Sequence, residues 1–330
     1  MTILLTGAAG FIGFHVSKAL LSRDEEVIGV DNINDYYDIR LKKARLAELE
    51  KYRGFSFKKV DISEHELMKS VVVGRKDIKY VIHLAAQPGV RYSIQNPFAY
   101  ARANLLGHMS ILEICRNLSN LEHLVYASSS SVYGGNKKVP FSVSDPTDTP
   151  VSLYAATKKA DELMSHCYGY LYGFPQTGLR FFTVYGPWGR PDMAIYIFCN
   201  AISAGKPIFV FNNGDMKRDF TYIDDIVDGV IKCVENPPNS CRGEPPCVLY
   251  NIGNEKSEPL MRLIQVLETS IGKKAEVKFK PMQLGDIKET FADISAIRNN
   301  LGYEPKTSID IGIPKFVDWF RKYEKESSYN

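Results

Sequence analysis

The sequence contains no run of about 18 apolar residues, which is the length that a membrane-spanning helix needs. It begins MTILLTGAAG and lacks the basic stretch and apolar core of a secretory signal. Internal repeats and low-complexity tracts are also absent. These absences argue against a membrane protein and a secreted protein, and they predict a cytoplasmic one.

Cysteine pairs of the C-x-x-C type are missing, although there are six cysteines. Four of them (Cys115, Cys167, Cys199 and Cys233) lie in apolar segments, where buried reduced thiols are common. Cys241 and Cys247 flank a proline-rich loop and could form a disulfide, but a reducing compartment is the simpler interpretation. We therefore expect neither a disulfide framework nor a metal site.

An excess of one charge is missing as well, because 41 Lys and Arg residues stand against 38 Asp and Glu, a net charge of +3. Proteins that bind nucleic acids or membrane surfaces cluster basic residues on one face or in runs. The balanced charge argues against both kinds of partner and leaves room for a small anionic ligand.

Short β-rich runs alternate with longer helical patterns in the first half of the 330 residues. We predict strands at 3–6, 27–30, 55–60, 80–84 and 123–127, and helices at 11–22, 38–51, 64–73 and 97–118. Several strands are continuously apolar, as strands covered on both faces must be. The pattern predicts an α/β fold with a Rossmann-type doubly wound parallel sheet.

The spacing changes after Pro187, where proline and glycine become frequent and the elements become shorter. We interpret this part as a smaller, mixed α/β substrate-binding lobe. The predicted division is a dinucleotide-binding domain at 1–186 and a lobe mostly at 187–330. Segments near 221–236 and 285–295 are expected to return to the first domain.

A glycine-rich turn, GAAGFIG at residues 7–13, follows the first strand and opens a helix. Gly7, Gly10 and Gly13 permit a tight turn, a close approach of the backbone to a diphosphate, and close packing of helix on strand. The helix N-terminus at Phe11 and Ile12 offers N–H groups to the phosphates. This strand–turn–helix context predicts a dinucleotide site.

Asp31 ends the second strand, where a carboxylate binds the adenosine ribose and repels a 2′-phosphate, so NAD is favoured over NADP. The alternative is that Asp31 merely begins a turn. Asp61 could accept a hydrogen bond from the adenine amino group or cap the helix that follows. The other residues that we place in the cofactor site are Asn32, Ile62, Leu84, Ala85, Ala86, Asn104, Tyr154 and Lys158.

The fifth strand leads into four consecutive serines, and Tyr154 and Lys158 follow with a spacing that puts them on one helix face. A tyrosine is a poor base at neutral pH unless a nearby cation lowers its pKa. Tyr154, aided by Lys158, could accept a proton from a substrate hydroxyl, and Ser129 could hydrogen-bond the same oxygen. Some of the serines could simply form a turn or cap.

Taken together, these residues resemble the extended short-chain dehydrogenase/reductase superfamily over essentially the whole chain. The sequence looks most like the nucleotide-sugar 4-epimerases, and among them the UDP-glucuronate 4-epimerases. Three stretches carry this resemblance: DNINDYYD at 31–38, AQPGVRYS at 86–93 and RFFTVYGPWGRPDMA at 180–194.

The resemblance implies a tightly held NAD that accepts hydride from sugar carbon 4 while Tyr154 takes the hydroxyl proton. The resulting 4-keto sugar turns over inside the site, and hydride returns to its opposite face. Dehydratases and decarboxylases of the superfamily carry a glutamate just before the Val-Tyr-Gly, where this sequence has Ser131. This difference favours epimerisation.

The resemblance also implies a set of substrate contacts. Ser128, Ser130, Thr183 and Arg190 would hold the sugar carboxylate, and this assignment is a hypothesis. Arg218 would meet the diphosphate, unless it is a surface arginine paired with a neighbouring aspartate, and Phe211 would stack on uracil or belong to the core. The other assigned substrate contacts are Gln87 and Asp286, and Gln283 lies in the same segment as Asp286.

Three alternatives remain open on the sequence: a 4-epimerase of neutral UDP-hexoses or N-acetylhexosamines, a UDP-uronate decarboxylase, and a non-catalytic dinucleotide-binding module. Members of the family often form dimers through two helices, here near 97–118 and 152–171. The apolar positions of these helices predict a homodimer, although the core explains much of their pattern. These positions are Leu105, Ile111, Leu112, Leu163, Met164 and Tyr168.

Overall fold

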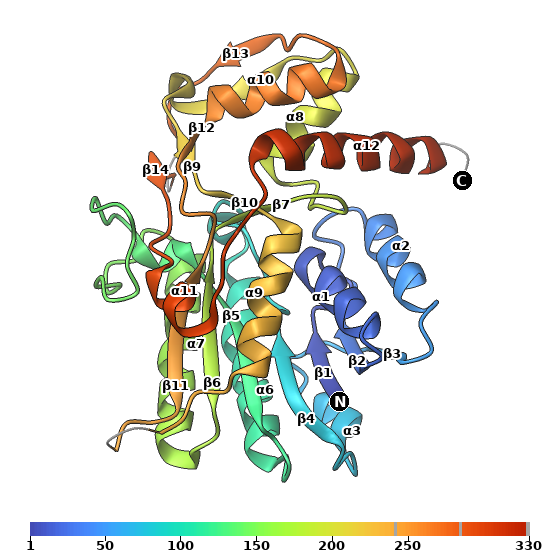
Figure 1. Ribbon diagram of the computed structural model, residues 1–330, viewed down its shortest axis with the longest axis vertical. Helices are drawn as coiled ribbons and strands as arrows, with labels where there is room; N and C mark the ends of the chain where they lie inside the picture. Colours follow the sequence, from blue (N-terminus) through green and yellow to red (C-terminus); the bar gives the residue numbers. More distant parts are fainter. Residues whose placement is uncertain (241–242, 284–285, 328–330) are drawn as a thin grey trace.

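The computed structural model describes residues 1–240, 243–283 and 286–327. Its centre is a seven-stranded parallel sheet with the strand order β11-β6-β5-β4-β1-β2-β3 (Figure 1). Because β1 lies between β4 and β2, the direction of strand succession reverses at β1, which is where doubly wound sheets bind ligands. The predicted fold class is confirmed. The strands are β1 (Thr2–Thr6), β2 (Glu26–Asp31), β3 (Phe55–Lys59), β4 (Ile78–His83), β5 (His123–Ser129), β6 (Gln176–Phe181) and β11 (Cys247–Ile252).

Helices cover both faces of this sheet, so its inner strands are buried on both sides. One apolar cluster joins the sheet to α1 (Phe11–Leu21) and α9 (Ile223–Glu235). A second cluster lies between the sheet and α3 (His65–Val72), α6 (Gly107–Asn117) and α7 (Leu153–Tyr172). A further helix, α2 (Ile39–Leu49), lies beside α1.

The helix predicted at 97–118 is one continuous helical run with a change of pitch. After α4 (Tyr92–Gln95), it consists of α5 (Pro97–Tyr100), a π-helical segment η1 (Ala101–Leu106) and α6. A π-helical segment shifts side chains around the helix axis and is frequent at functional sites. Here it holds Asn104 in the interior.

The second lobe lies beyond the carboxyl ends of the central strands, where α8, α10, β13 and α12 group together in Figure 1. It contains three small sheets of order β10-β7, β12-β9-β14 and β13-β8. Its helices are α8 (Ala194–Ser203), α10 (Leu260–Ile271) and α12 (Ile309–Ser327). Its strands are β7 (Thr183–Tyr185), β8 (Ile208–Val210), β9 (Lys217–Arg218), β10 (Phe220–Tyr222), β12 (Glu258–Pro259), β13 (Val277–Phe279) and β14 (Glu289–Thr290).

The chain passes between the two parts more than once. After β10, α9 returns to pack against α1 and β5, and β11 pairs with β6 as the seventh strand of the central sheet. Helix α11 (Ser295–Leu301) then lies against β11. The predicted division at residue 186 did not include β11 in the first part, because its six residues follow a proline-rich loop and show no helical partner in the sequence.

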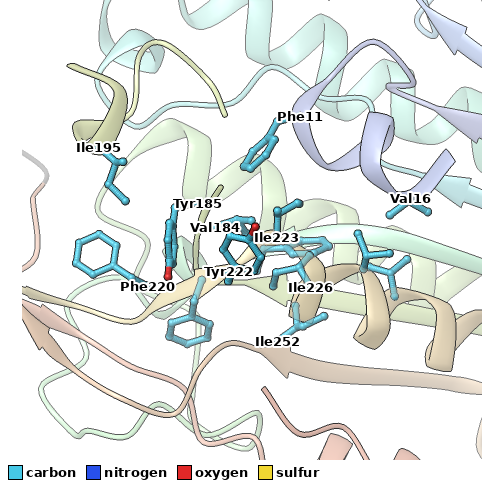
Figure 2. Packing of buried hydrophobic residues seen from close by; sticks show 14 of the residues in the cluster. Phe11, Val16, Val184, Tyr185, Ile195, Phe220, Tyr222, Ile223, Ile226 and Ile252 are labelled. Carbon is cyan, nitrogen blue, oxygen red and sulfur yellow. The ribbon is translucent and has the colours of Figure 1, made fainter. Parts of the chain in front are cut away.

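Apolar side chains fix the two parts to each other just below the ligand-binding edge of the sheet. Figure 2 shows Phe11 of α1, Tyr185 of β7, Tyr222 of β10 and Ile223 of α9 in one cluster. All four are at most 5% exposed. The junction is therefore a packed core, and it gives the residues around it fixed positions.

Across the described residues, no helix combines the length and the apolarity needed to cross a membrane. Cys115, Cys199 and Cys233 are buried free thiols. Cys167 is exposed, so its predicted burial was wrong, because it lies on the outer face of an α7 that is buried only on the other side. Cys241 lies outside the described residues.

Candidate active site

A cavity of about 930 Å³ lies between the carboxyl ends of the central strands and the second lobe. Its lining includes almost all the residues assigned to the site from the sequence. They are Gly7, Gly10, Phe11, Ile12, Asp31, Asn32, Asp61, Ile62, Leu84, Ala85, Ala86, Ser128, Ser129, Ser130, Tyr154, Lys158, Thr183, Arg190, Phe211, Arg218 and Asp286. Gly13, Gln87, Asn104 and Gln283 do not belong to this lining.

The glycine turn is packed so closely that side chains would not fit. Gly7 has a φ of +78°, and a Cβ atom added to it would lie 2.8 Å from the Ala85 nitrogen at the end of β4. A Cβ on Gly13 would lie 2.0 Å from the Gly7 carbonyl oxygen. Gly13 therefore acts by packing α1 onto the turn. The turn and the first residues of α1 form a cradle of backbone that fits a diphosphate.

Asp31 is buried at the end of β2 and accepts hydrogen bonds from the Ala9 and Ile33 backbone nitrogens, at 3.2 and 2.8 Å. Burial raises the pKa of its carboxyl group, and the nearby Lys42 opposes this shift. The carboxylate holds the glycine turn and also faces the cavity. A ribose with free hydroxyls fits beside it better than a 2′-phosphate does.

Asp61 serves the turn that precedes α3. Its carboxylate accepts hydrogen bonds from the Ser63 backbone nitrogen at 2.9 Å, the Ser63 hydroxyl at 2.7 Å and the Asn32 amide at 3.0 Å. Burial works in the opposite direction, but these hydrogen bonds hold the pKa of Asp61 below its usual value. Asp61 therefore closes a side-chain turn before α3 and does not cap the helix, whose N-cap is Glu64, and the same side chain lines the cavity.

Tyr154 and Lys158 lie at the start of α7, which the Ser152 hydroxyl caps by accepting a hydrogen bond from the Ala155 nitrogen at 3.1 Å. The Lys158 ammonium is buried and donates to the Ala127 carbonyl and to the Asp161 carboxylate, both at 2.9 Å. An ammonium has three N–H donors, so one remains for a ligand. Both Tyr154 and Lys158 face the cavity.

The serines at the end of β5 have different surroundings. The Ser129 hydroxyl donates to Ser131 at 3.1 Å at the edge of the cavity. The Ser128 hydroxyl donates to Glu162 at 2.6 Å, and Glu162 forms a buried ion pair with Arg180 at 2.8 Å. The predicted sugar contact of Ser128 would therefore compete with a bond to a buried carboxylate.

Asn104 and Gln87 lie outside the cavity lining and are hydrogen-bonded to each other. Asn104 is 1% exposed, accepts a hydrogen bond from the Gln87 backbone nitrogen at 2.8 Å and donates to Thr157 at 2.9 Å. Gln87 is also buried, and its amide donates to the Pro88 carbonyl at 3.3 Å. Neither side chain belongs to the cavity lining, so the contact of Asn104 with the cofactor and that of Gln87 with the sugar stay predictions.

One cationic end of the cavity contains Arg190. Its guanidinium donates to both carboxylate oxygens of Asp192, with the Nε atom 3.0 Å from Oδ1. The Tyr36 hydroxyl donates to the same carboxylate at 3.1 Å. Burial, followed by the charge of Asp192, raises the pKa of Tyr36 to about 12. Tyr36 lies in the stretch DNINDYYD, which carried the family resemblance, but it was not among the site residues predicted from the sequence.

The other cationic end contains Arg218 and a second arginine, Arg91, which sequence reasoning did not assign. Arg91 donates to Asp286 at 3.1 Å, and its guanidinium lies 5.1 Å from the centre of the Phe211 ring. Arg218 donates to the backbone carbonyl of Lys288 at 3.1 Å, and burial lowers its pKa. The stretch AQPGVRYS carried the signal for Arg91, and only the fold brings it next to Phe211.

Within residues 1–240, 243–283 and 286–327, no group of three or more His, Cys, Asp or Glu side chains could hold a metal ion. The site instead joins a dinucleotide-type glycine turn to a Tyr–Lys pair and to two cationic ends. This combination is typical of an enzyme with a dinucleotide cofactor, and the cavity has room and cationic side chains for a second ligand.

Residues 3–253 match the NAD dependent epimerase/dehydratase family, and the chain belongs to this family. UDP-glucuronate 4-epimerase 4 of Arabidopsis thaliana is 47% identical to it over 98% of this chain and 76% of the relative. A crystal structure of UDP-glucuronic acid 4-epimerase from Bacillus cereus, in complex with UDP-glucuronic acid and NAD, is 34% identical with a TM-score of 0.89. The match covers 98% of this chain and the whole of the Bacillus cereus chain.

A structure of UDP-glucose 4-epimerase from Thermotoga maritima, with UDP-glucose, is also similar. It is 29% identical with a TM-score of 0.88, over 98% of this chain and all of that chain. Together these findings confirm the predicted family, the predicted NAD cofactor and the prediction of an epimerase. The glycine cradle and the buried Asp31 fit the diphosphate and the ribose of NAD.

Proposed function

We propose that the protein interconverts UDP-glucuronate and UDP-galacturonate by inverting carbon 4 of the sugar. The observation that carries this proposal is a single cavity that joins Tyr154 and Lys158 to the glycine turn and to two cationic ends. One end, Arg190, suits the sugar carboxylate, and the other, Arg91 with Arg218, suits the diphosphate, because a guanidinium can bind two oxygens of an anion.

In this mechanism Tyr154 accepts the proton of the sugar 4-hydroxyl and later returns it. Ser129 hydrogen-bonds the same sugar oxygen and fixes its orientation. Lys158, held by Ala127 and Asp161, lies one helical turn after Tyr154 and has a third N–H with which to hold the ligand in place. NAD, held by the glycine turn and Asp31, would supply the hydride acceptor for carbon 4 and the donor for the return step.

Inversion requires the oxidised sugar to present its other face without leaving the cavity. The end that contains Arg91 and Arg218 supports this, since it can hold the nucleotide while the sugar turns. Ser131 stands where an eliminating or decarboxylating relative would carry a glutamate, and a hydroxyl group is a weak acid and a weak base. Hence we favour epimerisation over loss of water or CO₂.

A second candidate is epimerisation of neutral UDP-hexoses. It is favoured by one observation: Asp192 already neutralises Arg190, so the sugar end of the cavity carries less free positive charge than the sequence indicates. The similar Thermotoga maritima structure contains UDP-glucose. Comparison of UDP-glucuronate and UDP-glucose as substrates separates the two candidates.

The test is to incubate the purified protein with UDP-glucuronate, without added NAD, and to resolve the products by chromatography with mass detection. We expect an isomer of unchanged mass, identified as UDP-galacturonate. A product lighter by CO₂ would identify a decarboxylase instead. No conversion even after NAD is supplied, together with conversion of UDP-glucose, would transfer the function to neutral hexoses.

We further propose a homodimer that forms through the outer faces of the helices at 97–117 and of α7. The predicted apolar positions are not all on the surface. Ile111 and Leu112 are fully buried in the core. Met164 and Tyr168 pack against the same core. Of the predicted positions, Leu163 is exposed (59%), and four further apolar side chains on these helices are exposed as well and support the proposal: Phe98 (84%), Leu106 (57%), Met109 (44%) and Tyr170 (71%).

Two broader assignments are also proposals. We propose that the lobe at 187–330, without its returning segments, binds the UDP part of the substrate, because Phe211 and Arg218 reach the cavity from it. We also propose a cytoplasmic location, which the free thiols at Cys115, Cys199 and Cys233 support.

A further inference from the structure

Arg45 of α2 is a buried cation without an evident counter-charge. Its side chain is 0% exposed, yet its hydrogen bonds go to neutral oxygens. One terminal nitrogen donates to the Ala9 carbonyl at 2.8 Å and to the Tyr37 hydroxyl at 2.7 Å, and the other donates to the Trp188 carbonyl at 2.6 Å. Its Nε atom is buried with no partner in the structure.

Burying a charge is costly unless an opposite charge compensates for it, and arginine is the usual choice where planar anions are bound. The charged neighbours of Arg45 are Asp31 and Lys42, whose charges oppose each other. The protein itself therefore supplies little net negative charge around this guanidinium. An anionic ligand on the other side of the glycine turn would compensate for it.

The position of Arg45 fits the diphosphate of NAD. Ala9, whose carbonyl Arg45 holds, lies inside the glycine turn between Gly7 and Gly10. The turn leads into α1, whose N-terminus has no side-chain cap, so its N–H groups are open to phosphate oxygens. Arg45 thus stands directly behind the backbone cradle and adds a full charge to the partial charge of the helix.

The other nitrogen of Arg45 holds the loop that leads to the sugar end of the cavity. Trp188 adopts a φ of +62°, which is rare for a bulky side chain, and its ring packs 5.3 Å from Phe14 and 5.5 Å from Trp319. His15 donates to the neighbouring Pro187 carbonyl at 2.9 Å. Arg190 follows two residues later and lines the cavity.

We propose that Arg45 is the buried counter-charge of the NAD diphosphate and the connection through which cofactor occupancy strengthens UDP-sugar binding. Loss of the charge releases NAD. Loss of the two-sided hydrogen bonding separates the glycine turn from the loop at 187–190 and weakens binding of the sugar. The choice of UDP-glucuronate as the sugar rests on the proposed function, whereas the assignment to NAD does not.

The experiment compares three variants by NAD content, NAD affinity and UDP-glucuronate affinity. Arg45→Met keeps most of the side-chain volume and removes the charge. Arg45→Lys keeps the charge, but a single ammonium cannot hold Ala9 and Trp188 as the fork does. Arg40→Met is the matched control, because Arg40 lies on the same helix and is exposed. Calorimetry measures both affinities, the second one with NAD at saturation.

For Arg45→Met we expect NAD binding to be weaker by about 30-fold or more, as when one partner of a buried charge pair is removed. For Arg45→Lys we expect most of the NAD affinity to return while UDP-glucuronate binding remains weak. Arg40→Met should match the wild type in all three measurements.

A folded Arg45→Met protein that retains wild-type NAD would overturn the proposal. If Arg45→Met does not fold, Arg45→Lys decides, and wild-type affinity of that variant for UDP-glucuronate would overturn the coupling. NAD content is measured without sugar, so a wild-type protein that retains NAD but does not bind UDP-glucuronate counts against the proposed function alone.

Discussion

Arg190 is already held by another residue of the site, and this limits what it can bind. Asp192 and the Tyr36 hydroxyl form one hydrogen-bonded group with it. A sugar carboxylate must therefore share the guanidinium with Asp192 or displace it. Thr183 lines the same cavity and can donate a hydroxyl hydrogen bond.

We expect Thr183→Val and Arg190→Ala each to raise the KM for UDP-glucuronate by roughly 10-fold or more, as loss of a charged or hydrogen-bonded contact does. A second expected sign is release of a decarboxylated pentose product, since a loosely held 4-keto uronate loses CO₂. Steady-state kinetics with product analysis measures both, with Arg40→Ala as the exposed control. Wild-type behaviour of both variants would remove these residues from the carboxylate site.

His123, which does not line the cavity, allows a test of how protonation of one buried side chain changes the stability of the fold. It is fully buried at the start of β5, where its ring donates to the Val234 carbonyl at 3.3 Å and contacts the Thr177 hydroxyl at 2.9 Å. Burial lowers its pKa to about 4. The neutral ring therefore supports the fold above pH 6.5, and this support is lost as the pH falls from 6.5 toward 4.

Between pH 7 and pH 5 the wild type should lose about 2 kcal/mol of stability through this group alone. His123→Gln keeps a donor and cannot titrate, so its loss over the same interval should be smaller by that amount. Guanidinium unfolding at the two pH values gives the comparison. Equal losses for the two proteins would show that His123 is not the titrating group.

At the scale of elements, the close packing of α1 against the glycine turn decides whether the diphosphate cradle can form. The Gly7 carbonyl occupies the space that any side chain at position 13 would need. The three atoms that an added Cβ would meet, the Gly7 oxygen and carbonyl carbon and the Ala8 Cα, all belong to the backbone, so the turn itself must move to admit a methyl group.

Gly13→Ala should therefore abolish retention of NAD while leaving most of the sheet folded. Gly135→Ala is the matched control, because a Cβ there meets only a Val151 methyl group at 3.8 Å. NAD content after gel filtration, with circular dichroism as the check on folding, is the measurement. Normal NAD content in Gly13→Ala would mean that the turn is not the diphosphate site.

The helices at 97–117 and α7 illustrate a second effect of element geometry. A helix that covers a sheet buries one stripe, and a helical period in the sequence cannot tell that stripe from one that faces a partner. The structure separates the two, with Ile111 in the core and Phe98 exposed. The π-helical segment between them shifts the stripe in a way that a regular period does not predict.

At the scale of the whole molecule, the exposed apolar face on these helices predicts self-association. Phe98→Asp combined with Leu163→Asp should convert a dimer into a monomer, because each charge would be buried against apolar side chains of the partner. Light scattering after size-exclusion chromatography measures the mass.

Val73→Asp serves as the control for the dimer, since Val73 is 73% exposed at the end of α3, which is not one of the helices of the proposed interface. It should leave the mass unchanged. A wild-type protein that is a monomer, or a double variant that remains a dimer, would contradict the proposed interface.

The sequence alone located the residues that act through local order. The glycine turn, Asp31 and the Tyr154–Lys158 pair could be predicted because strand–turn–helix spacing and the i, i+4 relation are local properties of the chain. The parallel sheet could also be predicted, because alternation of buried strands with helices leaves few other arrangements. Their common place in one cavity follows from that topology.

Tertiary structure alone decided the roles that depend on contacts between distant segments. Arg45 and Trp188 are 143 positions apart, and Ser128 and Glu162 are 34 apart, so neither hydrogen bond leaves a periodic trace in the sequence. The same holds for the Arg91–Asp286 pair and for the seventh strand, β11. Local geometry is encoded in neighbouring residues, whereas which buried charge meets which partner is settled only when the whole chain packs.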